Sequence, residues 1–448
     1  MMDISLPGGL SVKQFRFLNH SYDHASGEAV LAYAFDDGEA FFERIRFPYH
    51  PWPSEPSRQA AFERALGLLH LIAGVSYYKA CVPQLMDPGD LLLDKDLAEF
   101  LNTLYVRGLA EFAYTNNIEL DSKVNFPINS AEVLTPLEVD LPERALVAMG
   151  GGKDSLVSLE LLRQGGCDVQ AVCVGQSKLI ADTAKAAGLP LIQIERELSP
   201  ALARMNEAGA LNGHVPVTAI NSVILLCASI LYGYRWIVFS NESSAEEATL
   251  KDSAGKEINH QFSKSLEFEK GFRKIITTQV SRGIDYFSLL RSLKELAIAQ
   301  KFSEMTQYHQ VFSSCNRNFH RDGPRITGRW CGNCPKCRFT SLALAPFMQA
   351  EELVSFMGIN LLDEAGQEEG FRALCELGID KPFECVGSVD ESRAAMLELF
   401  SRDSWKEKHI VANLGPELSL LKPPGIDVML AARGEHCIPS IVLKHVAF

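Results

Sequence analysis

Short apolar strands and helical segments alternate between residues 144 and 240, and this alternation constrains the fold more than any other feature of the sequence. It predicts βαβ units, in which parallel strands are joined by right-handed crossover helices. The expected strands are 145–149, 169–174, 191–194 and 236–240, and the expected helices are 155–164, 178–187 and one that begins near residue 217. We therefore expect an α/β protein with a parallel sheet.

The 448 residues are too many for one ordinary core, so we expect three parts. Strand-like segments followed by helical periodicity predict an N-terminal α+β domain over 1–140. A polar, proline-containing stretch at 116–142 marks its end. The sheet domain then covers 141–345, with a long amphipathic helix expected at 287–301, and 346–448 is expected to form a small, mainly helical C-terminal domain.

The formal net charge of −13 disfavours non-specific binding to nucleic acid or to an anionic membrane, because both favour basic surfaces. The N-terminal sequence carries no export signal, which predicts a cytoplasmic protein. Residues 215–234 contain no charged side chain and could span a bilayer by length alone. Polar residues interrupt their first half, so we predict a buried helix beside the sheet. From the acidic net charge we expect a small-molecule substrate rather than a nucleic-acid or membrane partner.

Three glycines, Gly150, Gly151 and Gly152, follow the first predicted strand and precede Lys153 and the first predicted helix. Glycines permit a turn in which several backbone N–H groups point at an anion, at the positive end of the following helix. The turn lacks the Gly-Lys-Ser/Thr ending of a Walker A loop and the G-x-G-x-x-G spacing of a dinucleotide loop. The alternative is a glycine turn without a ligand. We predict a phosphate site.

Cys331, Cys334 and Cys337 have C-x-x-C-x-x-C spacing, and Cys315 lies sixteen residues before the first of them. Two-residue spacers let thiolates converge on one tetrahedral ion, so we predict a structural zinc site with four cysteine ligands. The alternatives are an iron–sulfur cluster, inert thiols, or His320 in place of Cys315.

The turn continues as Gly152-Lys153-Asp154-Ser155, and here the sequence resembles the PP-loop ATP pyrophosphatases, whose motif is Ser-Gly-Gly-x-Asp-Ser. Gly150 stands where that family usually has serine. The resemblance implies a Rossmann-like (HUP-type) sheet domain that binds ATP and splits it into AMP and diphosphate. It also implies that Asp154 binds or orients Mg²⁺, and that Lys153 or Ser155 contacts phosphate oxygens.

Further characteristic segments are spread over the whole chain, at 149–155, 213–218, 240–242, 259–265, the cysteine group and 381–387. Through these segments the chain resembles the MurL-type UDP-N-acetylmuramoyl-L-alanyl-L-glutamate epimerases of peptidoglycan synthesis. The resemblance implies inversion of the terminal L-glutamate of UDP-MurNAc-L-Ala-L-Glu to D-glutamate through an acyl-adenylate, which makes the UDP-linked muramoyl dipeptide the small-molecule partner.

Several polar residues in these segments are candidates for the site. Asn241 and Glu242 directly follow a predicted strand, where α/β proteins bind ligands, and are predicted to contact nucleotide or metal. The other candidates are His214 for catalysis or substrate binding, His260 and Cys385 for acid/base catalysis, and Gln261 and Lys264 for substrate binding. The alternative for each is an ordinary exposed or core side chain.

Two other functions fit parts of the sequence. The glycine turn together with the cysteine group is similar to 7-cyano-7-deazaguanine synthase, which implies an ATP-dependent amide- or nitrile-forming ligase. A non-catalytic zinc-ribbon adaptor with a degenerate PP-loop is the third hypothesis.

Overall fold

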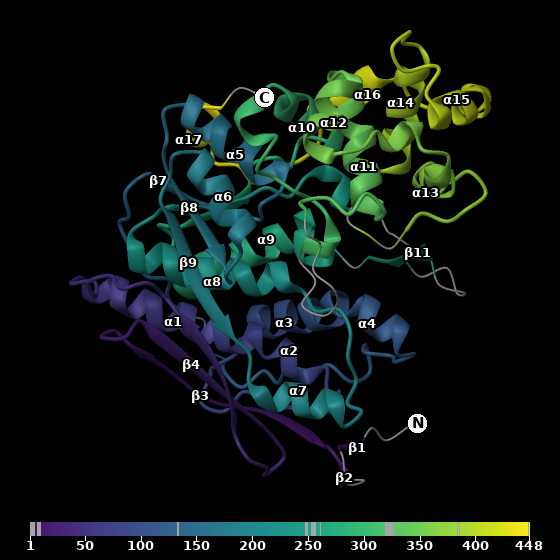
Figure 1. Ribbon diagram of the computed structural model, residues 1–448. Coiled ribbons are helices and arrows are strands. Elements are labelled where there is room, and N and C mark those ends of the chain that lie inside the picture. The colour runs from purple at the N-terminus through teal and green to yellow at the C-terminus, as the bar shows by residue number, and fades with distance from the viewer. Residues whose placement is uncertain are drawn as a thin grey trace.

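A computed structural model describes residues 5–6, 10–131, 134–246, 250–251, 257–259, 261–318, 326, 328–382, 384, 386–446 and 448. A nine-stranded sheet runs through the molecule in the order β13-β10-β7-β8-β9-β5-β4-β3-β6. Figure 1 shows the N-terminal strands and the C-terminal helices at opposite ends of the molecule.

The four predicted strands pair in parallel, as expected, and a fifth strand, β13, extends this parallel part of the sheet beyond β10. They are β7 (Arg144–Ala148), β8 (Asp168–Val174), β9 (Leu191–Glu197), β10 (Trp236–Phe239) and β13 (Asp285–Ser288). Alternate residues of each strand face opposite sides of the sheet. Trp236 and Val238 belong to one hydrophobic core, and Ile237 and Phe239 belong to the other. The α/β class with a mostly parallel sheet is thereby confirmed.

Helices cover both faces of the sheet. Residues of α5 (Lys153–Gln164), α6 (Lys178–Ala186) and α10 (Glu295–Ser303) pack into the core of one face. Residues of α8 (Val217–Tyr232) and α9 (Leu266–Ile275) pack into the core of the other face. The chain moves outward from β7 through β8 to β9, and then returns through α8 to β10 on the opposite side of β7. The boundary between β7 and β10 is therefore a topological switch point.

The N-terminal segment forms an antiparallel ribbon, which joins the parallel sheet directly. Its strands are β3 (Gln14–Asp23), β4 (Glu28–Phe35) and β5 (Phe41–Arg46), and the short β6 (Leu85–Asp87) pairs in parallel with β3 at the edge of the sheet. Strand β5 pairs antiparallel with β9, so the sheet is continuous across the boundary that we expect near residue 140. The accompanying helices are α1 (Pro56–Ala73), α2 (Val75–Tyr78), α3 (Lys95–Gly108), α4 (Ala110–Thr115) and, later in the chain, α7 (Pro200–Glu207).

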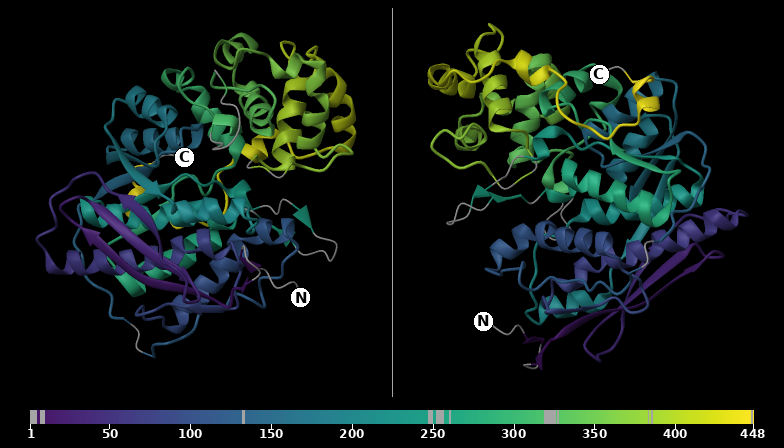
Figure 2. Two further views of the ribbon diagram at one scale, coloured as in Figure 1. Left: turned by 60° about the horizontal axis from the view of Figure 1, so that its bottom comes forward. Right: turned by 180° about the vertical axis from the view of Figure 1, so that it is seen from behind.

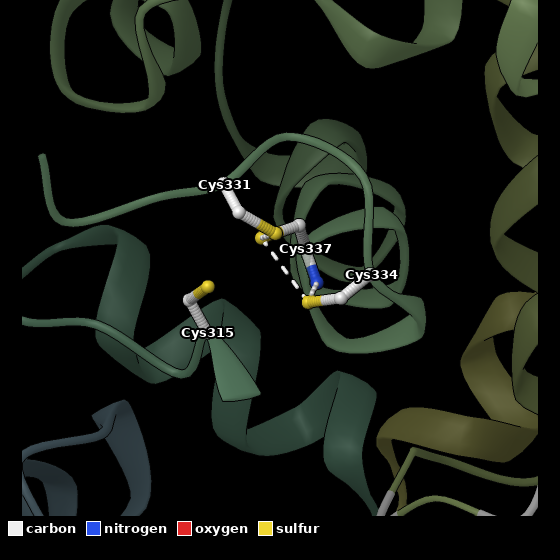
Figure 3. Close-up of side chains that lie close together, drawn as sticks. All are labelled: Cys315, Cys331, Cys334 and Cys337. Atoms are coloured by element: carbon white, nitrogen blue, oxygen red, sulfur yellow. Dashed lines mark hydrogen bonds between the residues drawn. The ribbon is translucent and has the colours of Figure 1, made fainter. Parts of the chain in front are cut away.

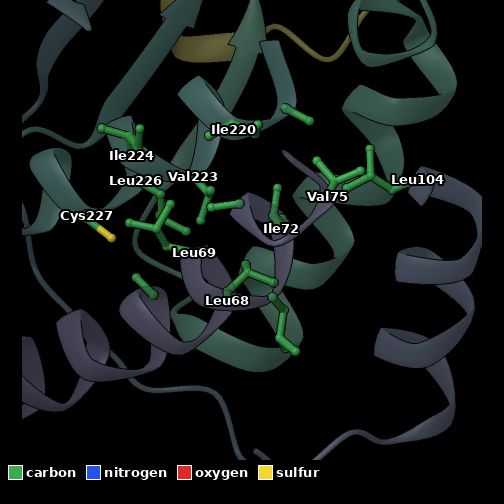
Figure 4. Close-up of a cluster of buried hydrophobic side chains, with 14 of the residues drawn as sticks. Leu68, Leu69, Ile72, Val75, Leu104, Ile220, Val223, Ile224, Leu226 and Cys227 are labelled. Atoms are coloured by element: carbon green, nitrogen blue, oxygen red, sulfur yellow. The ribbon is translucent and has the colours of Figure 1, made fainter. Parts of the chain in front are cut away.

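The uncharged segment near residue 217 forms α8 and is buried, as predicted. Leu68, Leu69 and Ile72 of α1 lie in the same cluster as Ile220 and Val223 of α8 (Figure 4). No charged side chain interrupts α8 because both the sheet and α1 cover it. Within the described ranges, none of the helices combines the length and the apolar character that a membrane crossing requires.

The single helix predicted over 287–301 is wrong. Residues 285–288 form the edge strand β13, a turn follows, and α10 begins only at Glu295. Phe287, Leu290 and Leu293 recur at helical spacing, but burial of the strand and the turn demands apolar residues at these positions too. The difference places Glu295 at the start of a helix rather than inside one.

The last third of the chain is helical (Figure 2). It comprises α11 (Pro335–Leu344), α12 (Ala350–Met357), α13 (Glu368–Leu374), α14 (Val389–Phe400), α15 (His409–Leu421), α16 (Ile426–Leu430) and α17 (Ser440–Leu443). The chain then returns to the sheet domain, where the His445 ring bonds the Gly165 carbonyl at 3.0 Å. Two small antiparallel pairs, β1 (Ser5–Leu6) with β2 (Leu10–Ser11) and β11 (Leu250–Lys251) with β12 (Glu257–Ile258), complete the strands.

Candidate active site

A polar pocket lies where β7, β10 and β13 end, at the switch point of the sheet. Ligands of open α/β sheets bind at this place because the strand ends diverge there. The residues that line the pocket are Lys153, Asp154, Ser240, Asn241, Glu242, Gln261, Lys264, Glu295, Ser314, Lys336, Phe339 and Thr340. The structure thus brings together six predicted site residues from segments far apart in sequence.

The glycine turn connects β7 to α5 beside this pocket. Gly151 has φ +77°, a left-handed conformation that glycine adopts without strain. A Cβ at Gly150 would meet no atom within 4 Å, so space is open above the turn. Gly152 is the N-cap of α5 and supplies no side chain to satisfy the first N–H groups. The turn can therefore accept an anion, as predicted for phosphate.

Lys153 is 4% exposed, and its ammonium group already contacts two carboxylates. Its Nζ donates to Asp154 Oδ1 at 2.5 Å and to Glu295. Burial by itself would lower the pKa of Lys153, but Asp154 and Glu295 outweigh burial and raise it. Lys153 therefore stays charged and joins the turn to the start of α10.

Three carboxylates, those of Asp154, Glu242 and Glu295, lie in the pocket and repel one another. Burial raises the pKa of Glu295 to about 8, against the attraction of Lys153, and the charges of Asp154 and Glu242 add to the rise. Burial likewise raises the pKa of Glu242 to about 7, against the attraction of Lys264. A divalent cation would relieve this repulsion, so the donor set fits Mg²⁺, which prefers carboxylate oxygens.

The segment after β10 is held by hydroxyl groups. Ser240 Oγ donates to Ser158 Oγ at 2.7 Å, and Asn241 Nδ2 donates to Ser288 Oγ at 3.0 Å. These bonds tie the segment to α5 and to β13. The side chain of Glu242 is thereby placed at the pocket.

A buried arginine supports two walls of the pocket from behind. Arg291 donates from Nη1 to the Glu242 carbonyl at 3.1 Å and from Nη2 to the Lys264 carbonyl at 2.6 Å. Lys264 Nζ in turn donates to Gln261 Oε1 at 3.4 Å. Arg291 itself pairs with Glu269 of α9. Neither Arg291 nor Glu269 lines the pocket, so both act through other residues.

The C-terminal helices contribute a buried carboxylate to the start of α10. Glu391 of α14 accepts from Leu296 N at 3.0 Å and from Ser244 Oγ at 2.6 Å. It also accepts from Ser388 N, which closes a capping box in α14. A carboxylate is favourable at a helix N-terminus. The hydrogen bond from Leu296 N to Glu391 fixes the backbone directly after Glu295.

The four predicted cysteines converge on one point (Figure 3). Their sulfur atoms all lie within 4.8 Å of one another, with Cys334 and Cys337 at 3.4 Å and Cys331 and Cys337 at 3.8 Å. Tetrahedral zinc with Zn–S bonds of about 2.3 Å holds its sulfurs about 3.8 Å apart. The residues therefore fit a single tetrahedral ion better than a cluster in which each thiolate binds a different iron.

Some predicted residues lie elsewhere. His214 does not line the pocket; its Nδ1 lies 3.6 Å from Glu111 Oε2 of α4. Ser155 is also absent from the lining, and its Oγ donates to the Gly152 carbonyl at 3.3 Å, which stabilises the turn. His260, His320 and Cys385 lie outside the described residues.

Sequence reasoning missed several lining residues: Glu295, Ser314, Lys336, Phe339 and Thr340. Ser314 and Lys336 had a usable signal, because each is next to a predicted metal ligand. Glu295 had a weaker one. It follows a short aromatic strand, but only by way of a turn of six residues, 289–294.

The fold and the pocket define a doubly wound α/β protein with a charged small-molecule site at its switch point. The chain belongs to the MurL family: the MurL N-terminal domain matches residues 9–289 and the MurL C-terminal domain matches residues 311–424.

Three relatives share 41–44% of their residues with this chain, and each is named UDP-N-acetyl-alpha-D-muramoyl-L-alanyl-L-glutamate epimerase. The protein of Xanthomonas oryzae pv. oryzae is 44% identical over 97% of both chains. That of Salinispora tropica is 42% identical over 89% of this chain and 88% of its own, and that of a Micromonospora species is 41% identical over 97% of both.

Proposed function

We propose that this protein epimerises the terminal L-glutamyl residue of UDP-MurNAc-L-Ala-L-Glu to D-glutamyl in peptidoglycan precursor synthesis, and that ATP activates the glutamate. The observation that carries the proposal is the pocket at the switch point, where carboxylates and lysines face the end of a glycine turn. The names of the three relatives supply the substrate.

ATP is proposed as a co-substrate of a PP-loop (HUP-type) domain. The glutamate α-carboxylate would attack the α-phosphorus, and the bond to the β-phosphate would break, releasing diphosphate. The N–H groups of the glycine turn would hold that diphosphate. Asp154 and Glu242 would hold Mg²⁺, which supplies charge neutralisation for the phosphates.

Activation makes the proton transfer accessible. Removing the α-proton of a free carboxylate creates a dianion, whereas an acyl-adenylate lets the carbonyl take up the charge. The proton must leave from one face of the α-carbon and return to the other, so two acid/base groups are needed. His214, His260 and Cys385 remain our predicted candidates. Water then cleaves the acyl-adenylate to AMP and the D-glutamyl product.

The cysteine group is proposed to bind structural zinc. Four converging thiolates leave no coordination position open for substrate or water, which is the arrangement of structural rather than catalytic zinc. The ion would hold the loop that contains Cys315 against the start of α11.

The decisive experiment incubates the full chain with ATP, Mg²⁺ and UDP-MurNAc-L-Ala-L-Glu in heavy water. We expect AMP and diphosphate in equal amounts, deuterium at the glutamyl α-carbon, and D-glutamate after hydrolysis. Asp154→Asn should abolish all three while leaving the thermal unfolding midpoint within a few degrees.

Two outcomes would reject the proposal. Formation of ADP and orthophosphate would mean that a different phosphorus is attacked. AMP release that needs ammonia and occurs without deuterium uptake would favour the amide- or nitrile-forming ligase. UDP-MurNAc-L-Ala, which lacks the glutamate, is the matched control and should give no AMP.

A further inference from the structure

One wall of the pocket is built from residues next to the cysteine ligands. Ser314 directly precedes Cys315, and Lys336 lies between Cys334 and Cys337. Phe339 and Thr340, one turn later on α11, line the same wall. The cysteine group and the pocket therefore share the same stretches of backbone.

The cysteines also set the direction of α11. Cys334 is its N-cap, and its Sγ accepts a hydrogen bond from Cys337 N at 3.4 Å. Figure 3 shows Cys315 facing the other three cysteines from a separate segment. Lys336 lies in the first helical turn of α11. The cysteine group that holds this helical turn therefore also holds the backbone from which the Lys336 side chain extends.

The segment before Cys315 lies against the glycine turn. Ser313 N donates to the Gly151 carbonyl at 3.1 Å, and Ser314 Oγ lies 3.3 Å from the position that a Cβ of Gly152 would take. An anion held by the glycine turn would therefore lie next to the wall that also carries Lys336.

Lys336 differs from Lys153 in its partners. Lys153 is neutralised by Asp154 and Glu295. Lys336 has no hydrogen bond or ion pair with any residue that the structure describes. A lysine that lines a pocket and is not engaged in an ion pair is suited to bind an anionic ligand.

We propose that Lys336 binds the phosphate chain of the nucleotide from the wall that adjoins the glycine turn, held in place by the cysteine group. This inference rests on the proposed function, because it assumes that the pocket takes ATP. It adds to that function a phosphate-binding residue that lies outside the glycine motif.

The test measures the affinity of the full, metal-loaded chain for Mg²⁺-diphosphate by calorimetry. Lys336→Gln should weaken binding by about tenfold or more, since a charge-assisted bond is lost. Lys336→Arg should stay within about threefold, because the charge remains. Arg338→Gln is the matched control. It lies on the same helix, but its side chain bonds Gln367 and Asn333 at 2.7 and 2.6 Å, and it should bind as the unchanged protein does.

Bound metal is counted in every variant with a chromogenic chelator, and we expect one ion per chain throughout. If Lys336→Gln loses metal, Lys336→Met, which keeps an apolar stem, replaces it. If Lys336→Gln binds Mg²⁺-diphosphate within twofold of the unchanged protein, the inference is overturned and the proposed function stays intact. If the variant weakens only the binding of the UDP-linked dipeptide, the inference is also overturned, because Lys336 would then contact that substrate. If the unchanged protein binds neither diphosphate nor ATP, the proposed function fails together with the inference.

Discussion

The guanidinium of Arg291 and the carboxylate of Glu269 form an ion pair of 3.0 Å in which each side chain is only 1% exposed. The same guanidinium donates to the carbonyls of Glu242 and Lys264, and Glu269 accepts from Ser288 N at 3.1 Å. A buried pair is a weak source of stability by itself, but its geometry is demanding. Its position behind two walls of the pocket suggests that it holds the backbone there.

Arg291→Lys should therefore lower kcat by about tenfold or more, because lysine keeps the charge but cannot bond two carbonyls and a carboxylate together. Steady-state AMP formation measures this effect. The matched control is Arg196→Lys, which alters another buried pair: Arg196 lies 2.7 Å from Glu43, and neither residue lines the pocket. Both variants should lose about 1–3 kcal/mol of unfolding free energy. Equal kinetic effects in the two would show that Arg291 matters only for stability.

Glu391→Gln should uncouple the C-terminal helices from α10. The carboxylate accepts from Leu296 N, Ser244 Oγ and Ser388, whereas an amide would turn its own N–H groups toward some of these donors. We expect a loss of about 1–3 kcal/mol in unfolding free energy together with reduced AMP formation. The matched control is Glu352→Gln, in the exposed capping box of α12, where Glu352 accepts from Gln349 N. This variant should lose less than about 1 kcal/mol of unfolding free energy and leave turnover unchanged.

Two neighbouring glycines should respond differently to serine. Gly151→Ser forces a side chain into φ +77° and within 3.2 Å of Leu179, so we expect a loss of about 1–2 kcal/mol in stability and weaker ATP binding. Gly150→Ser places a side chain in open space and should change stability by no more than about 0.5 kcal/mol. Thermal unfolding and ATP titration measure both. A Gly150→Ser variant that loses ATP binding would contradict this account of the turn.

Removing one cysteine of the metal group should release the ion. We expect one zinc per chain in the unchanged protein, and a metal-poor Cys331→Ser variant whose unfolding midpoint falls by about 5 °C or more, because metal affinity contributes to folding. Elemental analysis and calorimetry test this. Cys167→Ser, at a partly buried cysteine outside the group, should keep its zinc. If the purified protein contains iron and inorganic sulfide instead of zinc, the four cysteines bind an iron–sulfur cluster and the zinc prediction is wrong.

His70 should make the protein less stable in acid. Burial lowers its pKa to about 3 from an ordinary value near 6.5, so the unfolded chain takes up a proton that the folded chain does not. The stability contributed by neutral His70 is complete above pH 6.5 and is lost as the pH falls from 6.5 toward 3. The slope is about 1.4 kcal/mol per pH unit. His70→Gln should remove this slope in denaturant titrations, whereas a change at the exposed His24 should leave it.

Much of the central sheet was predictable because each strand and helix carries its own periodicity. The same reasoning failed at 287–301, where a strand, a turn and a helix are all buried and all apolar. That error hid Glu295, whose position beside Lys153 depends on where α10 begins. Tertiary contacts of a polar side chain were not predictable in the same way. His214 has a polar, turn-like context, and the structure places it 3.6 Å from Glu111 rather than in the pocket lining, so its role stays a prediction.

The sequence by itself determined the glycine turn, the four-cysteine group and the alternation of strands with helices, because these depend on spacing within short segments. Only the tertiary structure decided that Glu295, Lys264 and Lys336 meet at the end of that turn. Their meeting depends on β10 and β13 pairing on one side of β7 and on the cysteines bringing α11 to the same edge. All three residues lie more than one hundred positions after the turn, and local periodicity carries no information about contacts over such separations.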